Sequence, residues 1–268
     1  MKIDLQEEGT GKAAEKALLG SLNQVDKVIA VMSGKGGVGK STVTALIAAY
    51  LARSGSRVGI LDADITGPSQ GRAFGLKPDR IESTNFGLQP VTTSSGIKMM
   101  SINFLLPQED DPVIWRGPLL AGAVNQFWGE VNWEDLEYMV VDLPPGTGDV
   151  PLTVLQSLPV DGLVIVSSPQ DLSFMVVKKA VKMAAKMNVP ILGLIENMSE
   201  VVCPHCGEKM GIFGQSQGEK VAAEMGIAFL GRLPWDLNLN QCMDQGKIES
   251  YQSPLVDETM GRISASLI

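Results

Sequence analysis

Residues 34–41 (GKGGVGKS) have the residue types and spacing of a phosphate-binding loop. The pattern G-x-x-x-x-G-K-[ST] is met by Gly34, Gly39, Lys40 and Ser41. Glycines allow backbone N–H groups to curl around phosphate oxygens without Cβ clashes. We expect Lys40 to reach the β- and γ-phosphates and the Ser41 hydroxyl to ligate Mg²⁺. The segment therefore predicts a nucleotide site.

The chain on either side supplies the strand and the helix that such a loop requires. Residues 27–32 (KVIAVM) are a β-branched, apolar run that predicts a strand, and residues 41–54 have the apolar spacing of a helix. A helix that begins near Lys40 directs the positive end of its dipole at the same phosphates. This context favours nucleotide binding over a glycine-rich turn that binds nothing.

Two carboxylate segments follow predicted strands. Asp62 ends one strand and Asp64 lies in the loop after it (DADITGPS), where a carboxylate can orient the attacking water or hold a metal-bound water. Asp142 ends another strand (VDLPPGTGD), an arrangement that supports Mg²⁺ directly or through water. Gly146 in that loop can bring a backbone N–H close to the γ-phosphate. The alternative for the first pair is two aspartates that cap a loop.

Base recognition is predicted from two loops. Asn197 directly follows the predicted strand 191–196, and an amide can bind the adenine edge through paired hydrogen bonds. Pro234 and Asp236 belong to the segment LPWD after a later strand, and similar proteins place this segment around adenine. An ordinary loop amide and loop proline are the alternative.

The segment Cys203-Pro204-His205-Cys206 has the spacing of a ligand pair for a metal or a cluster. Two thiolates three positions apart can bind one metal ion or one edge of a cluster. A closed tetrahedral site needs four ligands, yet the third cysteine, Cys242, stands alone and the single histidine lies between the pair. Two subunits related by a twofold axis would supply four thiolates.

Several chemistries remain open for this pair. A redox pair normally opens a helix, whereas Gly207 follows Cys206 at once and favours a metal-binding turn. Four thiolates suit zinc and iron–sulfur clusters alike, so the spacing does not separate them. Cys242 is expected to be a small buried residue rather than a ligand.

The order of apolar segments predicts a single α/β domain with a doubly wound, mostly parallel sheet and helices on both faces. Residues 1–26 are expected to be an N-terminal extension with a short helix at 12–22, and residues 27–268 the nucleotide-binding domain. Helices are expected at 172–187 and 257–268. The predicted strands are 27–32, 57–62, 138–142, 163–167, 191–196 and 227–230.

The composition narrows the function classes. The 268 residues are 44% hydrophobic, enough for one large core, and the net charge of −8 argues against a nucleic-acid surface. No apolar run reaches the length of a membrane span, and the polar N-terminus lacks the apolar region of a signal peptide. Three cysteines are too few for a secreted disulfide framework, so we expect a reducing, cytoplasmic location.

The loop KGGVGKS resembles the deviant Walker A loop of the MinD/ParA/nitrogenase iron protein class of ATPases. In that class the extra lysine, here Lys35, reaches the partner's nucleotide across a dimer interface. The ordered motifs KGGVGKS, DADITGPS, VVDLPPGTGD, ENMS and CPHCG resemble the Mrp/ApbC family of iron–sulfur carrier ATPases. This resemblance implies a homodimer that holds a labile [4Fe-4S] cluster between paired Cys203 and Cys206. It also implies that ATP binding or hydrolysis is coupled to loading the cluster or passing it to apo-proteins. We expect the hydrolysis to be slow, because the loops are suited to switching.

Residues and resemblance together define the expected site. The expected catalytic residues are Lys35, Lys40, Asp64 and Asp142. The expected nucleotide contacts are Gly34, Lys35, Gly36, Gly37, Val38, Gly39, Lys40, Ser41, Thr42, Asp62, Gly146, Asn197, Pro234 and Asp236. The expected metal ligands are Ser41 and, through water, Asp142 for Mg²⁺, with Cys203 and Cys206 for the cluster or for zinc.

Two other functions are weighed against the carrier. A positioning ATPase of the MinD/ParA type calls for a membrane-binding tail or a basic DNA surface, and the segment 257–268 has only one basic residue. A zinc-stapled dimer that acts by protein interaction alone is the other. A nitrogenase-type reductase is disfavoured because that class places its cluster cysteines in separate loops.

Overall fold

The computed structural model describes residues 23–64, 67–77, 81–85, 87–105, 117–170, 174–203 and 205–267. The helix predicted at 12–22 lies outside these residues. Within the described chain, no helix has both the length and the apolar character that crossing a bilayer requires.

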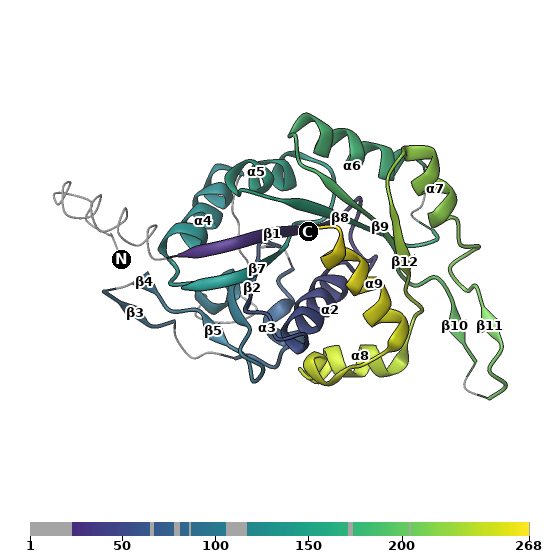
Figure 1. Cartoon of the computed structure of the whole chain (residues 1–268), viewed down its shortest axis with the longest axis horizontal. Coiled ribbons are helices and arrows are strands. Elements are labelled where there is room, and N and C mark those ends of the chain that lie inside the picture. Colours follow the sequence, from purple (N-terminus) through teal and green to yellow (C-terminus); the bar gives the residue numbers. More distant parts are fainter. Residues whose placement is uncertain are drawn as a thin grey trace.

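One sheet of eight strands, counted over the described residues, forms the centre of the molecule (Figure 1). Its order is β12-β9-β8-β1-β7-β2-β6-β5, and every neighbouring pair is parallel except β5 with β6. The strands are β1 (Gln24–Ser33), β2 (Val58–Asp62), β5 (Val91–Thr92), β6 (Lys98–Ser101), β7 (Asp135–Asp142), β8 (Gly162–Ser167), β9 (Ile191–Glu196) and β12 (Phe229–Arg232). This confirms the predicted fold class.

Helices cover both faces of the sheet, as Figure 1 shows. One face packs against α4 (Gly117–Glu130), α5 (Asp149–Ser157), α6 (Phe174–Lys186) and α7 (Gly218–Met225). The other packs against α2 (Lys40–Arg53), α3 (Gln70–Ala73), α8 (Leu237–Asp244) and α9 (Pro254–Ala265). The central strand β1 is buried on both sides, because Val28 and Ala30 enter one core while Ile29 and Val31 enter the other.

Short elements join these layers. They are the hairpins β3 (Ser83–Thr84) with β4 (Gly87–Leu88) and β10 (Val201–Val202) with β11 (Lys209–Met210), and the 3₁₀ turns η1 (Ile102–Leu105) and η2 (Ile248–Ser250). In Figure 1 the β10–β11 hairpin projects from the side of the molecule, beyond the edge strand β12.

Several strand boundaries differ from prediction by one to three residues, and two of these differences have identifiable reasons. β12 begins at Phe229 rather than 227, because the Ile227 N–H bonds to the Ala222 carbonyl and helps to close the end of α7 at Gly226. β1 begins at Gln24 rather than 27, because Gln24 and Val25 continue the pairing with β7.

Candidate functional site

The phosphate-binding loop joins β1 to α2 at the carboxyl edge of the sheet. Gly39 has a φ of 81° and caps the first turn of α2. A Cβ there would lie 2.1 Å from the side-chain nitrogen of Asn197, and one on Gly34 would lie 1.7 Å from Val176 Cγ1. Both positions therefore need glycine, because the loop passes tightly between α6 and the end of β9.

Strand register brings the predicted carboxylates together. β7 lies between β1 and β2, with Asp142 paired to Val31 on one side and to Asp62 on the other. Because parallel strands end at the same edge, Asp62 and Asp142 meet beside the start of α2. Both residues are fully buried.

The Lys40 ammonium lies within this carboxylate group. It donates a hydrogen bond to Asp142 Oδ1, lies 3.2 Å from Asp64 Oδ2 and 3.4 Å from Ser41 Oγ. Burial lowers the pKa of Lys40, but Asp142 and then Asp64 outweigh burial, so that the pKa is raised above its ordinary value. Lys40 is therefore a cation held at the loop by two acidic partners.

Gln70, a residue that the sequence reasoning missed, positions Asp142. Its side-chain nitrogen donates to Asp142 Oδ2 at 2.8 Å and to the Ser41 carbonyl at 2.9 Å, while Thr44 Oγ1 bonds to Asp142 Oδ1 at 3.2 Å. Gln70 is fully buried, yet its Oε1 has no hydrogen-bond partner. This oxygen is a buried acceptor beside Ser41 and Asp142, which is what a metal-bound water requires.

Asp62 lies in a different environment from Asp142. It accepts hydrogen bonds from the Asp64 and Gln70 backbone N–H groups at 3.2 and 3.3 Å and from Ser101 Oγ at 3.3 Å. Burial, and then the charge of Asp142, raise the pKa of Asp62 to about 8. At neutral pH the neutral acid is therefore favoured, and a protonated carboxyl is a weaker metal ligand than a carboxylate.

The loop after Asp142 contacts the phosphate-binding loop directly. Gly146 has a φ of 99°, and its N–H donates to the Ser33 carbonyl at 2.9 Å. The Ser33 hydroxyl in turn donates to the Lys35 carbonyl at 2.8 Å. The Gly146 N–H, predicted to donate to the γ-phosphate, thus donates to the Ser33 carbonyl in this structure. A phosphate bound there would replace that carbonyl as the acceptor.

Lys35, Gly36 and Gly37 lie exposed at the tip of the loop, whereas Val38 is buried. Thr42 is partly exposed near the start of α2. An exposed lysine on the nucleotide face is compatible with contact to a second subunit.

Two of the residues predicted to contact the base, Asn197 and Asp236, form hydrogen bonds within the protein. The buried Asn197 donates from its side-chain nitrogen to the Val38 carbonyl at 3.0 Å. Asp236 caps α8 by accepting from the Asn238 and Leu239 N–H groups, and it also accepts from Tyr251 Oη at 2.9 Å. These bonds fix the loop containing Pro234, and adenine contact by the three predicted residues stays a prediction.

The cysteine pair lies at the tip of the β10–β11 hairpin. The Cys203 N–H bonds to the Glu208 carbonyl, and the Gly207 N–H bonds to the Cys203 carbonyl, both at 2.9 Å. Gly207 has a φ of 74°, which allows the tight turn. Cys203 is partly exposed and Cys206 exposed. The backbone N–H groups of Cys206 and then His205 lower the pKa of the Cys203 thiol, which favours the thiolate needed for metal binding.

The remaining cysteine is placed elsewhere. Cys242, predicted to be a small buried residue rather than a ligand, lies on α8 and is partly buried against the core that includes α2 and α9. Among the residues that the structure describes, no group of three or more His, Cys, Asp and Glu side chains is close enough to hold a metal ion.

The fold and the site define the class of protein. A doubly wound sheet, a phosphate-binding loop at its switch point and a strand-end aspartate beside the loop lysine are the features of a P-loop NTPase. The family model described as "ParA: NUBPL iron-transfer P-loop NTPase" matches residues 24–268, so the chain belongs to that family. This confirms the recognition made from the ordered motifs.

Known proteins agree with this assignment. The chain is 48% identical over 240 residues to an iron-sulfur cluster carrier protein from Clostridium perfringens, covering 86% of this chain and 84% of that one. A carrier protein of the same name from Methanocaldococcus jannaschii is 47% identical over 227 residues, covering 84% and 78%. A nucleotide-binding protein from Archaeoglobus fulgidus, solved with ADP, superposes with a TM-score of 0.80 at 44% identity, covering 90% and 93%. The cell division ATPase MinD from Pyrococcus furiosus, at 18% identity, coverage of 90% and 99%, and a TM-score of 0.67, shares the fold.

The raised pKa of Asp62 predicts a pH-dependent stability. The native protein keeps a proton that the unfolded chain releases near pH 4, so stability falls as the pH rises from about 4 to about 8, by at most about 1.4 kcal/mol per pH unit. Asp62→Asn removes this titration and should lose less stability over that range. Urea unfolding of nucleotide-free protein at pH 5, 6.5 and 8 measures the difference. Asp135→Asn, at an exposed carboxyl, is the control, and equal slopes in wild type and Asp62→Asn would contradict the prediction.

Proposed function

We propose that the protein is an ATP-dependent carrier of iron–sulfur clusters. In this proposal a homodimer binds a labile [4Fe-4S] cluster as cargo between the paired Cys203 and Cys206 and transfers it to apo-proteins. The observation that carries the proposal is the pair of accessible thiols at the tip of a projecting hairpin, on a chain that also has a complete phosphate-binding loop. The names of the relatives support it.

The nucleotide chemistry follows from the carboxylates that surround Lys40. An incoming triphosphate competes with Asp142 and Asp64 for the ammonium, which would move from its carboxylates to the phosphates. Asp64, released from Lys40, would orient the attacking water. The Gly146 N–H would then donate to the γ-phosphate instead of the Ser33 carbonyl. This change would order the loop after Asp142, so that the position of the loop would depend on whether ATP is bound.

The residues present fit Mg²⁺. The Ser41 hydroxyl would bind the ion, while Asp142 and the unpartnered Gln70 Oε1 would accept hydrogen bonds from its waters. Mg²⁺ supplies charge neutralisation of the phosphates when bound. Asp62 is the register partner of Asp142 on the adjacent strand, and its raised pKa would keep a proton in this group of carboxyls.

The hairpin supplies half of a cluster site. Four thiolates are the usual ligands of a [4Fe-4S] cluster, and each subunit offers two at an exposed tip. Two hairpins related by a twofold axis would complete the set, and Lys35 reaching the partner's nucleotide would tie the same dimer to ATP. A site with only two ligands from each subunit, at an exposed position, suits a cluster that has to be transferred to another protein.

Replacing both ligand cysteines tests the cargo. Cys203→Ala with Cys206→Ala should abolish cluster assembly, because no second pair can replace these thiolates, while ATP affinity stays unchanged. Anaerobic reconstitution followed by iron and sulfide analysis should give about four of each per wild-type dimer and none in the variant. Cys242→Ala is the matched control and should retain the cluster. Cluster retained by the double variant would contradict the ligand assignment, and a wild-type dimer that takes up zinc but never iron and sulfide would favour a structural metal.

Gln70→Leu tests the support of the metal site. The substitution removes the donor to Asp142 Oδ2 and the unpartnered oxygen, so the increase in nucleotide affinity that Mg²⁺ confers should fall by about tenfold. Affinity measured in EDTA should change much less. Calorimetric titration of ADP with and without Mg²⁺ gives both values, and an unchanged Mg²⁺ effect would contradict the role of Gln70.

Mixing two inactive variants tests action in trans. Lys35→Ala should lower ATP hydrolysis by roughly a thousandfold, in the range of a cation supplied across an interface. Lys40→Ala should also be inactive, since it loses the lysine of its own site. Their heterodimer contains one complete site, formed by Lys40 of one subunit and Lys35 of the other, and should recover activity. A mixture shown to contain heterodimers but without activity would contradict the proposal.

A further inference from the structure

The thiol hairpin begins beside the loop that carries Pro234, for which adenine contact is predicted. The Ser199 N–H and hydroxyl both bond to the Leu233 carbonyl, at 3.0 and 3.1 Å, and the Trp235 N–H bonds to the Glu200 carbonyl at 2.8 Å. Val201 forms a parallel bridge with Trp235. The outgoing limb of the hairpin is thus fixed to the loop that carries Pro234.

The returning limb is fixed by Glu196, the last residue of β9. This carboxylate is fully buried, and it accepts from the Gln217 and Gly218 N–H groups at 3.0 and 3.1 Å and from the Ser216 hydroxyl. Arg232 Nε lies 3.6 Å from it. The donors all belong to the chain that returns from Cys206 and enters α7, so one side chain holds this limb.

The next residue contacts the phosphate-binding loop. Asn197 bonds through its side chain to the Val38 carbonyl, and its N–H bonds to the Ser167 carbonyl at 2.7 Å. The Leu233 N–H bonds to the Glu196 carbonyl at 2.9 Å, which joins the anchors of the two limbs. Two consecutive residues therefore connect the phosphate-binding loop with both limbs of the hairpin.

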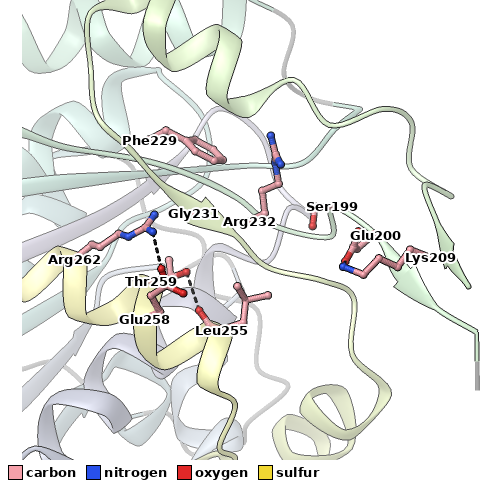
Figure 2. Close-up of a pocket in the computed structure, with 10 residues that line it drawn as sticks. All are labelled: Ser199, Glu200, Lys209, Phe229, Gly231, Arg232, Leu255, Glu258, Thr259 and Arg262. Atoms are coloured by element: carbon pink, nitrogen blue, oxygen red, sulfur yellow. Dashed lines mark hydrogen bonds and ion pairs between the residues drawn. The ribbon is translucent and has the colours of Figure 1, made fainter. Parts of the chain in front are cut away.

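Open space flanks the hairpin base between these anchors. A cavity of about 290 Å³ lies between Ser199, Glu200 and Lys209 at the hairpin base and residues of β12 and α9. Figure 2 shows the residues that line it, with Glu200 and Lys209 on the hairpin side and Leu255, Glu258 and Arg262 on α9. A second cavity of about 410 Å³ is lined by Ser199, Glu200 and Lys209, and by Gly211, Gly214, Gln215 and Ser216 of the returning limb. The limbs are bridged here by the Glu200–Lys209 ion pair at 2.6 Å. The hairpin base is therefore held by hydrogen bonds and an ion pair, with open cavities next to it. A shift of its anchors, Glu196 and Leu233, can move the hairpin without repacking a hydrophobic core.

We propose that Glu196 is a positioning residue that couples nucleotide binding to the Cys203–Cys206 pair. This inference rests on the proposed function for its purpose, but its geometry is independent of the cargo. Phosphates that enter the loop adjust the backbone at Val38, Asn197 follows through its hydrogen bond, and Glu196 carries the displacement to Ser216–Gly218. The thiols of the hairpin then change their exposure and environment.

The test measures thiol alkylation in iron-free protein. Mass spectrometry follows the rates at which iodoacetamide modifies Cys203 and Cys206, with and without ADP and Mg²⁺. ADP fills the loop without presenting a γ-phosphate to a partner's Lys35. Wild type should show a rate change of about fivefold or more, at the lower end of typical coupling between sites. Calorimetry measures ADP affinity in parallel.

Glu196→Gln keeps the shape of the side chain but removes its charge and places an N–H₂ group against donors. The effect of ADP on alkylation should fall to less than about twofold while ADP affinity is retained. Ser216→Ala, which removes one donor only, should reduce the effect partly and serves if Glu196→Gln does not fold. Glu219→Gln is the matched control, because this exposed carboxylate pairs with the far side of Arg232 and should keep the wild-type response.

The outcomes are decisive for this residue. An unchanged ADP effect in both Glu196→Gln and Ser216→Ala, or no ADP effect in wild type, would overturn the coupling. Loss of ADP binding together with the effect would assign Glu196 a purely structural role and would also overturn it. Failure of cluster reconstitution would refute the carrier function while leaving this thiol measurement intact, so the two proposals fail separately.

Discussion

The buried ammonium of Lys40 and its carboxylate partners are the interaction on which the nucleotide site depends. A cation this deeply buried is stable only when it is paired, and Asp142 and Asp64 supply that pairing. The arrangement requires β1, β7 and β2 to be adjacent and in one register, because only then do Lys40 and Asp142 meet. The same charges would be uncompensated if Lys40 alone left, so phosphates with Mg²⁺, which bring both signs of charge, are suitable replacements.

Much of the fold and of the phosphate-binding site could be predicted from the sequence, because local patterns of residues determine both. Double-sided burial makes the parallel strands continuous apolar runs, and the strand 191–196 has the predicted bounds. The phosphate-binding loop is specified within eight residues, so its glycines, Lys40 and Ser41 were predictable by spacing. Asp142 was predictable for a related reason, since a strand-end aspartate after VV is a local signal that the fold then carries to the loop.

The residues that were missed act through contacts distant in sequence. Gln70 lies in a segment without helical or strand periodicity, and its role appears only when α3 packs beside the end of β7. Glu196 ends an apolar strand, where a carboxylate suggests solvent, yet it is buried by a chain segment some twenty residues later. The edge strand β5 and its neighbour β6 were missed because strands of two and four residues are too short to show a distinctive pattern. Pairing partners, rather than propensity, decide such elements.

The position of the thiol pair completes the physical argument. A cluster held deep in the core would be protected but could not be delivered, while thiols on an unattached loop would have no connection to ATP. The β10–β11 hairpin lies between these extremes, with an exposed tip and a base bonded at Glu196 and Leu233 to the elements that contact the phosphate-binding loop. Exposure permits transfer, and the bonded base permits control. A carrier driven by nucleotide needs both properties in one short segment.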